Sequence, residues 1–227
     1  MNLVLLARRA DLLEATAAAL RTQHSVEVRT LALDLADRDL AEKLRGVTAS
    51  LDVGVAVYNA AYAPVGVFAQ QPPEALDAVV DVNVRGPMTF ARTLLPPMIA
   101  RGRGALVLMS SLAGFQGTPR LTSYAASKAF NTVLAEGLWA ELRGCGIDVV
   151  AACAGAIRTP GYAATAKREA PGTLDAEDVA ERTLLALSRG PLVIPGFINK
   201  LAAWIIGRIA PRRLSIAVMG ANTKDLA

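Results

Sequence analysis

The sequence predicts an α/β protein with a mostly parallel sheet. Short apolar runs rich in Val, Leu and Ala alternate with longer amphipathic stretches, an alternation typical of stacked βαβ units. Glycine pairs mark turns between these stretches, Gly102 with Gly104 and Gly144 with Gly146. With 227 residues, 53% of them hydrophobic, the chain is long enough for one large core, so we expect a single domain over residues 1–227.

The expected strands are the short apolar runs, because such runs suit a parallel sheet that is buried on both faces. In chain order they are Leu3–Leu6, Val26–Leu33, Val53–Tyr58, Ala105–Met109, Asp148–Ala152 and Leu192–Ile194. The amphipathic stretches between them are the expected helices. They are Ala10–Arg21, Leu40–Ala49, Pro73–Val80, Val84–Ala100, Ser123–Arg143 and Ala176–Ser188. We expect Pro160–Gly172 to be a loop and residues 191–227 to form an apolar and basic extension of the same domain.

Composition excludes several classes of function. The net charge of +4 comes from 24 basic and 20 acidic residues that are scattered along the chain, whereas nucleic-acid binding requires basic clusters. Cys145 and Cys153 are too few for a metal knuckle or a disulfide framework, and no secretory leader is recognisable. We therefore expect no nucleic-acid partner, no metal site and a reducing, cytoplasmic location.

The apolar stretch Pro191–Ala210 is too interrupted to cross a bilayer, because its longest uncharged apolar run, Leu201–Gly207, is short. Two interpretations stay open. Trp204 followed by Arg208 and Arg212 fits a segment that lies on a membrane surface, since an apolar face with basic flanks is the interfacial pattern. The same segment also fits packing on the core or on a second subunit.

The residues that directly follow the expected strands are the candidates for ligand contact. In an open parallel sheet, ligands bind at the carboxyl ends of the strands. The residues at these positions are Arg8, Asp34, Asn59, Ser110, Ser111 and the turn Ala154–Thr159.

Tyr124 and Lys128 form a candidate acid–base pair. Their four-residue spacing puts both side chains on one face of the expected helix. A tyrosine hydroxyl has a pKa near 10 and is a poor base at neutral pH, but a neighbouring ammonium group stabilises the phenolate. Ser111 ends an apolar strand thirteen residues before Tyr124 and can face it across the end of the sheet. Helix capping is the alternative role for this serine.

These residues stand in segments that resemble the short-chain dehydrogenase/reductase family over nearly the whole chain. Ser110-Ser-Leu-Ala-Gly-Phe-Gln-Gly-Thr-Pro followed by Tyr-Ala-Ala-Ser-Lys128 resembles the family's active-site block. Val57-Tyr-Asn-Ala-Ala61 is similar to its Asn-Asn-Ala-Gly strand end, and Val82-Asn-Val84 to the segment of its fourth catalytic residue.

The resemblance implies an oxidoreductase that interconverts a carbonyl and an alcohol by hydride transfer. Tyr124 would be the general acid and base, and Ser111 would bind the substrate oxygen. Lys128 would lower the Tyr124 pKa and hold the nicotinamide ribose. Asn83 would support a water relay behind the lysine, although on its own it is equally suited to cap a helix.

The resemblance also implies a cofactor site. Leu33-Asp-Leu35 resembles the adenine-contacting strand end, so Asp34 and Leu35 join Asn59 and Ala60 as cofactor contacts. Ala154-Gly-Ala-Ile-Arg-Thr159 resembles the turn beside the nicotinamide, with Ala154 in place of a proline and Thr159 at the contact. Arg8 occupies the position that reads the adenosine ribose, and a guanidinium there favours a 2′-phosphate. We therefore expect NADP(H) in preference to NAD(H).

One family motif has no counterpart, the glycine-rich turn that binds the cofactor pyrophosphate at a helix N-terminus. By its motifs the chain starts at the family's second strand, so we expect a Rossmann-like, doubly wound sheet that is N-terminally truncated, with the first strand missing. The alternative is a non-catalytic scaffold or binding module. A dehydratase or epimerase is disfavoured, because it needs a further acid or base and the single histidine, His24, is far along the chain from Tyr124.

Substrate and assembly are less strongly indicated. The family sets substrate choice with the loop after the sixth strand, which here contains Tyr162, Lys167 and Arg168, and with the C-terminal segment. The apolar residues around Trp204 favour an apolar carbonyl or alcohol substrate, but they suit a core or an interface equally well. The helix Ser123–Arg143 is apolar on more than one face, and the family pairs through it, so we expect a homodimer or homotetramer.

Overall fold

The structure is a computed structural model that describes residues 1–165, 169–224 and 226. Lys167 and Arg168, which sequence analysis assigned to a substrate loop, lie outside the described residues.

Contacts group the chain into two compact units, Met1–Asp52 and Val53–Ala227. The expectation of a single domain, with residues 191–227 as its extension, stays a prediction.

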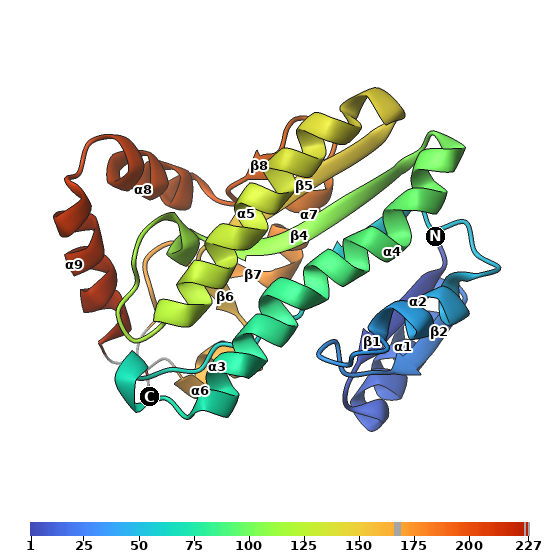
Figure 1. The fold of residues 1–227 in the computed structure, drawn as a ribbon, viewed down its shortest axis with the longest axis horizontal. Helices are drawn as coiled ribbons and strands as arrows, with labels where there is room; N and C mark the ends of the chain where they lie inside the picture. The colour runs from blue at the N-terminus through green and yellow to red at the C-terminus, as the bar shows by residue number, and fades with distance from the viewer. Residues whose placement is uncertain (166–168, 225, 227) are drawn as a thin grey trace. The chain divides into compact units, whose positions relative to one another are not determined.

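Helices and strands alternate along most of the chain (Figure 1), as the apolar periodicity predicts. The strands are β1 (Leu3–Ala7), β2 (Val28–Ala32), β3 (Val55–Tyr58), β4 (Gly104–Ser111), β5 (Ile147–Ala154), β6 (Ile157–Arg158), β7 (Leu174–Asp175) and β8 (Leu192–Val193). The α-helices are α1 (Ala10–His24), α2 (Leu40–Thr48), α3 (Pro73–Val80), α4 (Gly86–Arg101), α5 (Thr122–Leu142), α6 (Pro160–Thr165), α7 (Ala176–Leu184), α8 (Phe197–Arg208) and α9 (Arg212–Thr223).

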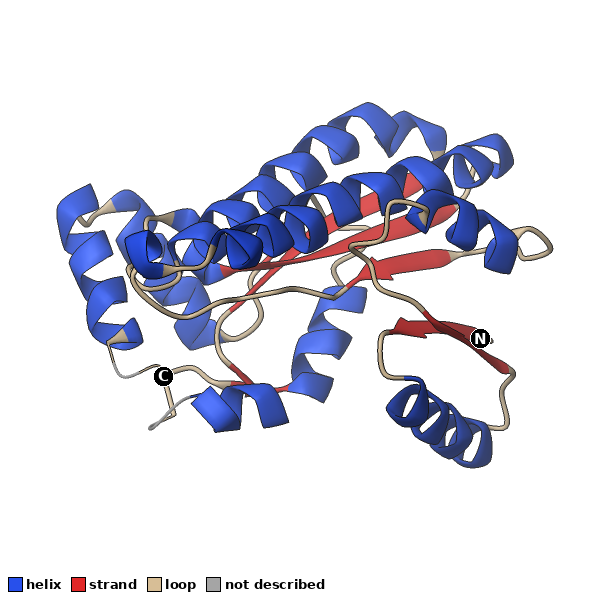
Figure 2. Cartoon of the chain, turned by 60° about the horizontal axis from the view of Figure 1, so that its bottom comes forward, coloured by secondary structure: helices blue, strands red, loops and turns tan. Residues whose placement is uncertain are grey.

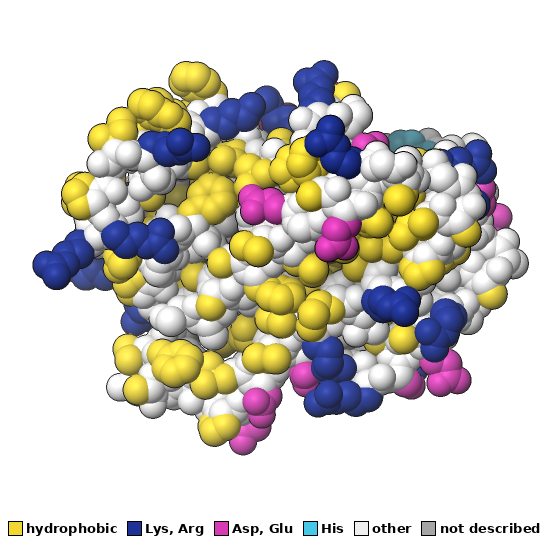
Figure 3. Space-filling model, turned by 45° about the horizontal axis from the view of Figure 1, so that its top comes forward, with side chains coloured by type: hydrophobic (Ala, Val, Ile, Leu, Met, Phe, Trp, Pro, Cys, Tyr) yellow, Lys and Arg dark blue, Asp and Glu magenta, His cyan; other side chains and the backbone are white. Residues whose placement is uncertain are grey.

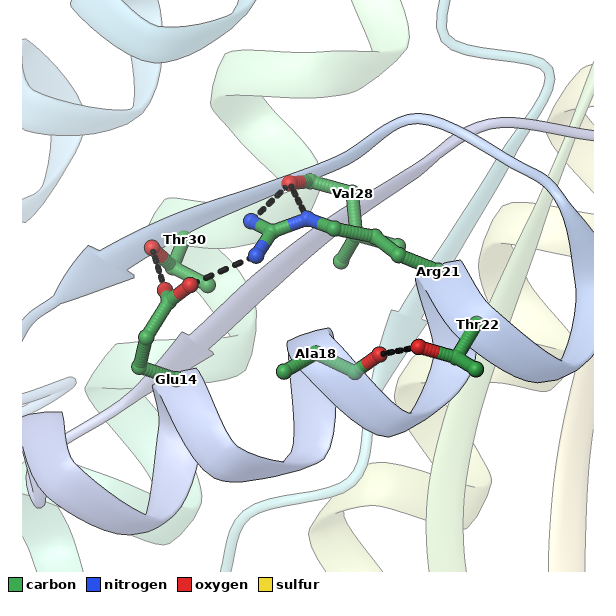
Figure 4. A network of polar contacts seen from close by, with 6 residues as sticks. All are labelled: Glu14, Ala18, Arg21, Thr22, Val28 and Thr30. Atoms are coloured by element: carbon green, nitrogen blue, oxygen red, sulfur yellow. Dashed lines mark hydrogen bonds and ion pairs between the residues drawn. The ribbon is translucent and has the colours of Figure 1, made fainter.

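The first unit is a β-α-β motif followed by α2. Its strands β1 and β2 pair in parallel, and polar contacts fasten α1 to β2 (Figure 4). The Arg21 guanidinium donates to the Val28 carbonyl at 3.1 Å from Nε and to Glu14 at 2.5 Å. Glu14 in turn accepts a 3.1 Å hydrogen bond from the Thr30 hydroxyl. These bonds lower the pKa of the Glu14 carboxyl and join the helix to the strand.

The second unit contains a four-stranded parallel sheet in the order β3-β4-β5-β8. Its centre is the long pair β4 and β5, which runs in register from Gly104 opposite Ile147 to Ser111 opposite Ala154. Figure 2 shows α4 and α5 lying along one face of this sheet. Both central strands are buried almost throughout, which explains their continuous apolar sequences.

Two glycines at the turns that flank this pair have left-handed backbone, as the sequence predicts. Gly102 follows α4 with φ +66°, and Gly146 precedes β5 with φ +70°. A Cβ atom on Gly146 would collide with the Gly102 carbonyl oxygen. The close approach of the two turns therefore requires a glycine at position 146.

The helix expected at Val84–Ala100 differs in its first turn. Residues Asp81–Arg85 form a π-helical turn, in which the Gly86 amide donates to the Asp81 carbonyl five residues back. The Tyr58 hydroxyl donates to the Val82 carbonyl at 2.5 Å, so that carbonyl is engaged by a side chain from β3. A π-helical turn of this kind is not revealed by the apolar pattern of the sequence.

The segments after β5 are more regular than expected. The segment Pro160–Gly172, expected to be a loop, begins with α6. The strand before it, β6, pairs in parallel with the strand after it, β7. Arg158 supports this pairing through ion pairs with Glu169 at 2.6 Å and Asp175 at 2.9 Å. The C-terminal extension contains α8 and α9.

The α/β class and the parallel sheets agree with the sequence prediction. The predicted absence of a first strand is not shown, because the structure begins with a β-α-β unit.

Candidate active site

Two consecutive serines end β4, and alternation along the strand sends their side chains in opposite directions. Ser110 is buried and bonds α5, donating to the Lys128 carbonyl at 2.7 Å and lying 2.7 Å from the Thr132 hydroxyl. Ser111 is half-buried, and its Oγ accepts the Ala113 amide at 3.2 Å. Ser110 therefore joins the strand to the helix, while Ser111 starts the next turn.

Lys128 is a buried lysine, with 3% of its surface exposed. Its Nζ donates to the main-chain carbonyl of Met109 at 2.6 Å. Because burial disfavours the charged amine, the pKa of Lys128 falls from 10.5 to about 8. Lys128 is still mostly protonated at neutral pH.

Tyr124 lies one helical turn before Lys128, and the Lys128 Nζ is 5.5 Å from the centre of its ring. The resemblance implies that Lys128 lowers the pKa of Tyr124, but burial raises the pKa of this phenol instead, and a side-chain hydrogen bond with Ser111 opposes that rise. The structure thus brings Ser111, Tyr124 and Lys128 together, the three residues that sequence analysis selected as a set.

Asn83 lies in the π-helical turn and is fully buried. Its side-chain oxygen accepts the Tyr62 amide and its Nδ2 donates to the Tyr62 carbonyl, both at 2.8 Å. The same Nδ2 donates to the Ser127 hydroxyl at 3.0 Å, and that hydroxyl donates to the Tyr124 carbonyl at 2.7 Å. Asn83 therefore holds the segment after β3 against the first turn of α5.

Sequence analysis missed the supporting residues of this cluster. Ser127 and Thr132 lie on the buried side of α5 and bond Asn83 and Ser110. Asn131 donates from Nδ2 to the Asn83 carbonyl at 3.1 Å. Polar residues in a helix that is otherwise apolar were the available signal, since buried polar side chains need partners.

The remaining candidate cofactor contacts of this unit follow the strands as predicted. Asn59 and Ala60 come directly after β3, with Asn59 exposed. Thr159 follows β6, is exposed, and accepts the Tyr162 amide on its hydroxyl at 3.1 Å. All three stand at carboxyl ends of strands, where a ligand can reach them.

Arg8, Asp34 and Leu35 belong to the first unit. The Arg8 guanidinium is 72% exposed and lies 4.0 Å from the Asp34 carboxylate. The other carboxylate oxygen of Asp34 accepts the Ala36 amide at 2.9 Å. Arg8 is thus only loosely engaged at the end of β1.

No group of His, Cys, Asp and Glu in the part of the chain that the structure describes is arranged to hold a metal ion.

Several known proteins share both sequence and fold with this chain. A 3-oxoacyl-CoA reductase of very-long-chain substrates from Anas platyrhynchos is 32% identical over 66% of this chain and 49% of its own length. A 7beta-hydroxysteroid dehydrogenase from Clostridium sardiniense is 32% identical over 70% of this chain and 61% of its own length. The chain therefore spans about half the length of the first of these relatives.

Solved structures agree with this likeness. A structure described for 7beta-hydroxysteroid dehydrogenase stereoselectivity matches with a TM-score of 0.90 and 26% identity, covering 96% of this chain and 87% of the other. A short-chain dehydrogenase from Sphingobium yanoikuyae in complex with NADPH matches with a TM-score of 0.79 and 27% identity, over 92% of this chain and 87% of the other.

The family model for short chain dehydrogenases matches residues 1–170, which include Ser111, Tyr124 and Lys128. This chain belongs to the family of short-chain NAD(P)-dependent dehydrogenases and reductases.

Proposed function

We propose that this chain is an NADP(H)-dependent oxidoreductase that interconverts a carbonyl and an alcohol, with Tyr124 as the general acid and base. The observation that carries the proposal is the buried Lys128 amine, 5.5 Å from the Tyr124 ring centre, beside a tyrosine that also bonds Ser111. A buried cation next to a phenol stabilises the phenolate that forms when the proton leaves.

In the direction of reduction, the Tyr124 hydroxyl gives its proton to the substrate oxygen. Ser111 donates a hydrogen bond to the same oxygen and so stabilises the negative charge that develops there. The raised pKa of Tyr124 keeps the phenol protonated at neutral pH until a substrate accepts the proton. A nicotinamide held beside Tyr124 and Lys128 would supply the hydride chemistry at the substrate carbon. In the opposite direction the phenolate removes the alcohol proton.

The residues of the second unit fit the nicotinamide side of such a cofactor. Lys128 offers ammonium protons beyond the one it gives to Met109, and Asn59, Ala60 and Thr159 stand at strand ends. In the first unit, the loosely held Arg8 guanidinium suits a 2′-phosphate, which supports NADP(H) over NAD(H). Asp34 and Leu35 are the proposed contacts to the adenine side.

The substrate is proposed to be an apolar carbonyl compound or the matching alcohol. Two kinds of relative support this class, the very-long-chain 3-oxoacyl-CoA reductases and the 7beta-hydroxysteroid dehydrogenase, since both names denote substrates with a large hydrocarbon part. Exposed apolar side chains on α8, including Phe197 and Trp204, add to the apolar surface that the described residues present.

A homodimer or homotetramer is the proposed assembly. The outer surfaces of α4 and α5 carry exposed apolar residues, among them Met88, Ile99 and Val133, and hydrophobic side chains recur over the face shown in Figure 3. Contiguous exposed apolar surface of this kind marks an interaction site. A cytoplasmic location is also a proposal.

A further strand and glycine-rich turn are proposed to complete the cofactor site. Among the described strands, β1 pairs with β2 alone. The strand β3 is the last strand of its sheet and pairs with β4 alone. Each sheet therefore has an edge that can accept another strand. The DNA upstream of the Met1 codon tests this proposal. A glycine-rich sequence in frame supports it, and an in-frame stop with no such sequence before it contradicts it.

The second candidate function is a non-catalytic scaffold, favoured by the absence of a glycine-rich turn from the sequence. Titration with NADPH and NADH, followed by nicotinamide fluorescence, separates the two functions. We expect NADPH to bind more tightly than NADH. Arg8→Gln should weaken the binding of NADPH by about tenfold, because a charge-assisted hydrogen bond is lost. The matched variant Arg9→Gln should leave the affinities for NADPH and NADH unchanged. No binding of either nucleotide would favour the scaffold.

Tyr124→Phe should lower kcat for NADPH-dependent reduction of apolar ketones by about 10²- to 10⁴-fold, because the proton donor is removed. Ser111→Ala should lower it by about 10²-fold, through loss of one hydrogen bond to the charged oxygen. Ser110→Ala is the control, since its buried hydroxyl bonds α5 and Cys153 of β5 and points away from Ser111. It should reduce stability to urea and change kcat by less than about tenfold. Unchanged turnover in Tyr124→Phe would remove Tyr124 from its proposed role.

Lys128→Met should stabilise the fold at pH 7 even as it abolishes activity. The folded-state pKa of about 8 lies below the ordinary value of 10.5, so below pH 8 the folded protein bears the full cost of the buried charge. Between pH 8 and 10.5 only the unfolded chain keeps the proton, and wild-type stability rises relative to the variant.

Urea unfolding of both proteins at pH 7 and pH 10.5 measures this difference. The advantage of Lys128→Met should shrink by roughly 2–3 kcal/mol over this range. Lys200→Met changes an exposed lysine, and its free energy of unfolding should change between the two pH values as that of the wild type does. An advantage that stays constant with pH would show that the Lys128 amine is not destabilised by burial.

A further inference from the structure

The helix α8 is oriented with its apolar side outward. Phe197, Leu201 and Trp204 recur at spacings of three and four residues, which puts them on one face. Phe197 is 79% exposed and Trp204 is 57% exposed. The opposite face carries Asn199, which is 4% exposed.

The inward side of α8 is held by polar bonds. Asn199 donates from Nδ2 to the carbonyls of Gly172 and Pro195, each at 3.0 Å. A surface helix ordinarily turns its apolar face to the core. In α8 apolar residues lie on both sides, because Ala203 and Ile206 are half-buried while Phe197 and Trp204 are exposed.

The next helix, α9, also has exposed apolar residues. Its buried residues are Ser215, which donates to the Ile206 carbonyl of α8 at 3.2 Å, and Thr223, with Ile216 and Met219 half-buried. Its outward residues include Leu214 and Val218, both exposed. The two helices contact each other and present one surface, which we call the α8–α9 surface.

The charged side chains of α8 and α9 are all basic in the described residues. Between Glu181 and Asp225 the sequence holds no acidic residue. Lys200, Arg208 and Arg213 are exposed, and no ion pair engages any of them in the described part of the chain. On the side of α8 and α9 in Figure 3, dark blue basic side chains lie among yellow apolar ones.

We propose that the α8–α9 surface docks on an anionic lipid membrane. An outward apolar face with exposed aromatic side chains and basic flanks matches the requirements of the lipid interface, where apolar groups enter the acyl boundary and cations meet lipid phosphates. None of the described helices is long and apolar enough to cross a bilayer, so the contact is made from the surface. Trp204 and Phe197 enter the interface, and Lys200, Arg208 and Arg213 bind headgroup phosphates.

The docking surface is tied to the segment that joins Ser111 to Tyr124. Arg212 donates to the Phe115 carbonyl at 2.8 Å, and the Thr223 hydroxyl donates to the Pro119 carbonyl at 2.7 Å. Docking therefore brings the loop beside the candidate active site near the lipid. The proposal does not depend on catalysis, because lipid binding is measured without turnover.

Vesicle sedimentation with the full chain tests the proposal. We expect the protein to sediment with phosphatidylcholine vesicles that contain phosphatidylglycerol, to stay in solution with phosphatidylcholine alone, and to be released by high salt. In a Trp139→Phe background Trp204 is the only tryptophan, since the sequence holds two. Its fluorescence should shift to shorter wavelength with the anionic vesicles.

Matched variants assign the binding to this surface. Phe197→Ser should weaken vesicle binding by more than about tenfold, whereas Phe68→Ser, which changes another exposed phenylalanine, should not. Arg208→Gln and Arg213→Gln should each weaken it by about fivefold. Arg182→Gln, at an exposed position on α7, is the charge control.

Two outcomes would overturn the proposal. One is equal sedimentation with anionic and neutral vesicles, or none with either. The other is a change of oligomeric state in Phe197→Ser, seen by sedimentation equilibrium, in a protein that does not bind vesicles. The latter outcome would assign the α8–α9 surface to an interface between copies of this chain.

Discussion

The candidate active site depends on one buried cation, the ammonium group of Lys128. Taking an amine out of water is costly unless a polar group compensates it. The Met109 carbonyl of β4 provides that compensation at 2.6 Å, and the Tyr124 ring lies at 5.5 Å. Because the acceptor belongs to the central strand of the sheet, the position of the amine is fixed by the core. The remaining cost appears as the pKa of about 8, as is usual for strained functional sites.

Hydrogen bonds that join α5 to the ends of two strands hold this cation in position. Ser110 bonds the helix to β4, while Asn83 bonds it, through Ser127, to the segment after β3. Asn83 reaches that position from a π-helical turn, and the Tyr58 hydroxyl engages a carbonyl of the same turn. Each fastening group is buried and uses its hydrogen-bonding capacity on the backbone or on another side chain. Tyr124 and Ser111, which bond each other, are thereby held side by side at the end of β4.

The spacing of apolar residues was sufficient to predict most strands and helices of both units, because that spacing follows the buried face of each element. The four-residue spacing of Tyr124 and Lys128, with the family resemblance, was sufficient to group them with Ser111. The π-helical turn was not predictable, since the apolar spacing fits an ordinary helix, and its contact with Tyr58 joins residues 24 apart. The exposure of the apolar face of α8 was also not predictable. The sequence is that of an amphipathic helix, but it does not show which face packs on the core. Arg8 lies in a separate unit from Tyr124.

The pKa of the Lys128 amine, followed by NMR of protein labelled at its lysine side chains and assigned with Lys128→Met, tests the central claim most directly. We expect this amine to titrate at about 8. A Lys128 titration at 10.5, the ordinary lysine value, would contradict it. The amine would then be in water, and no buried cation would act on Tyr124.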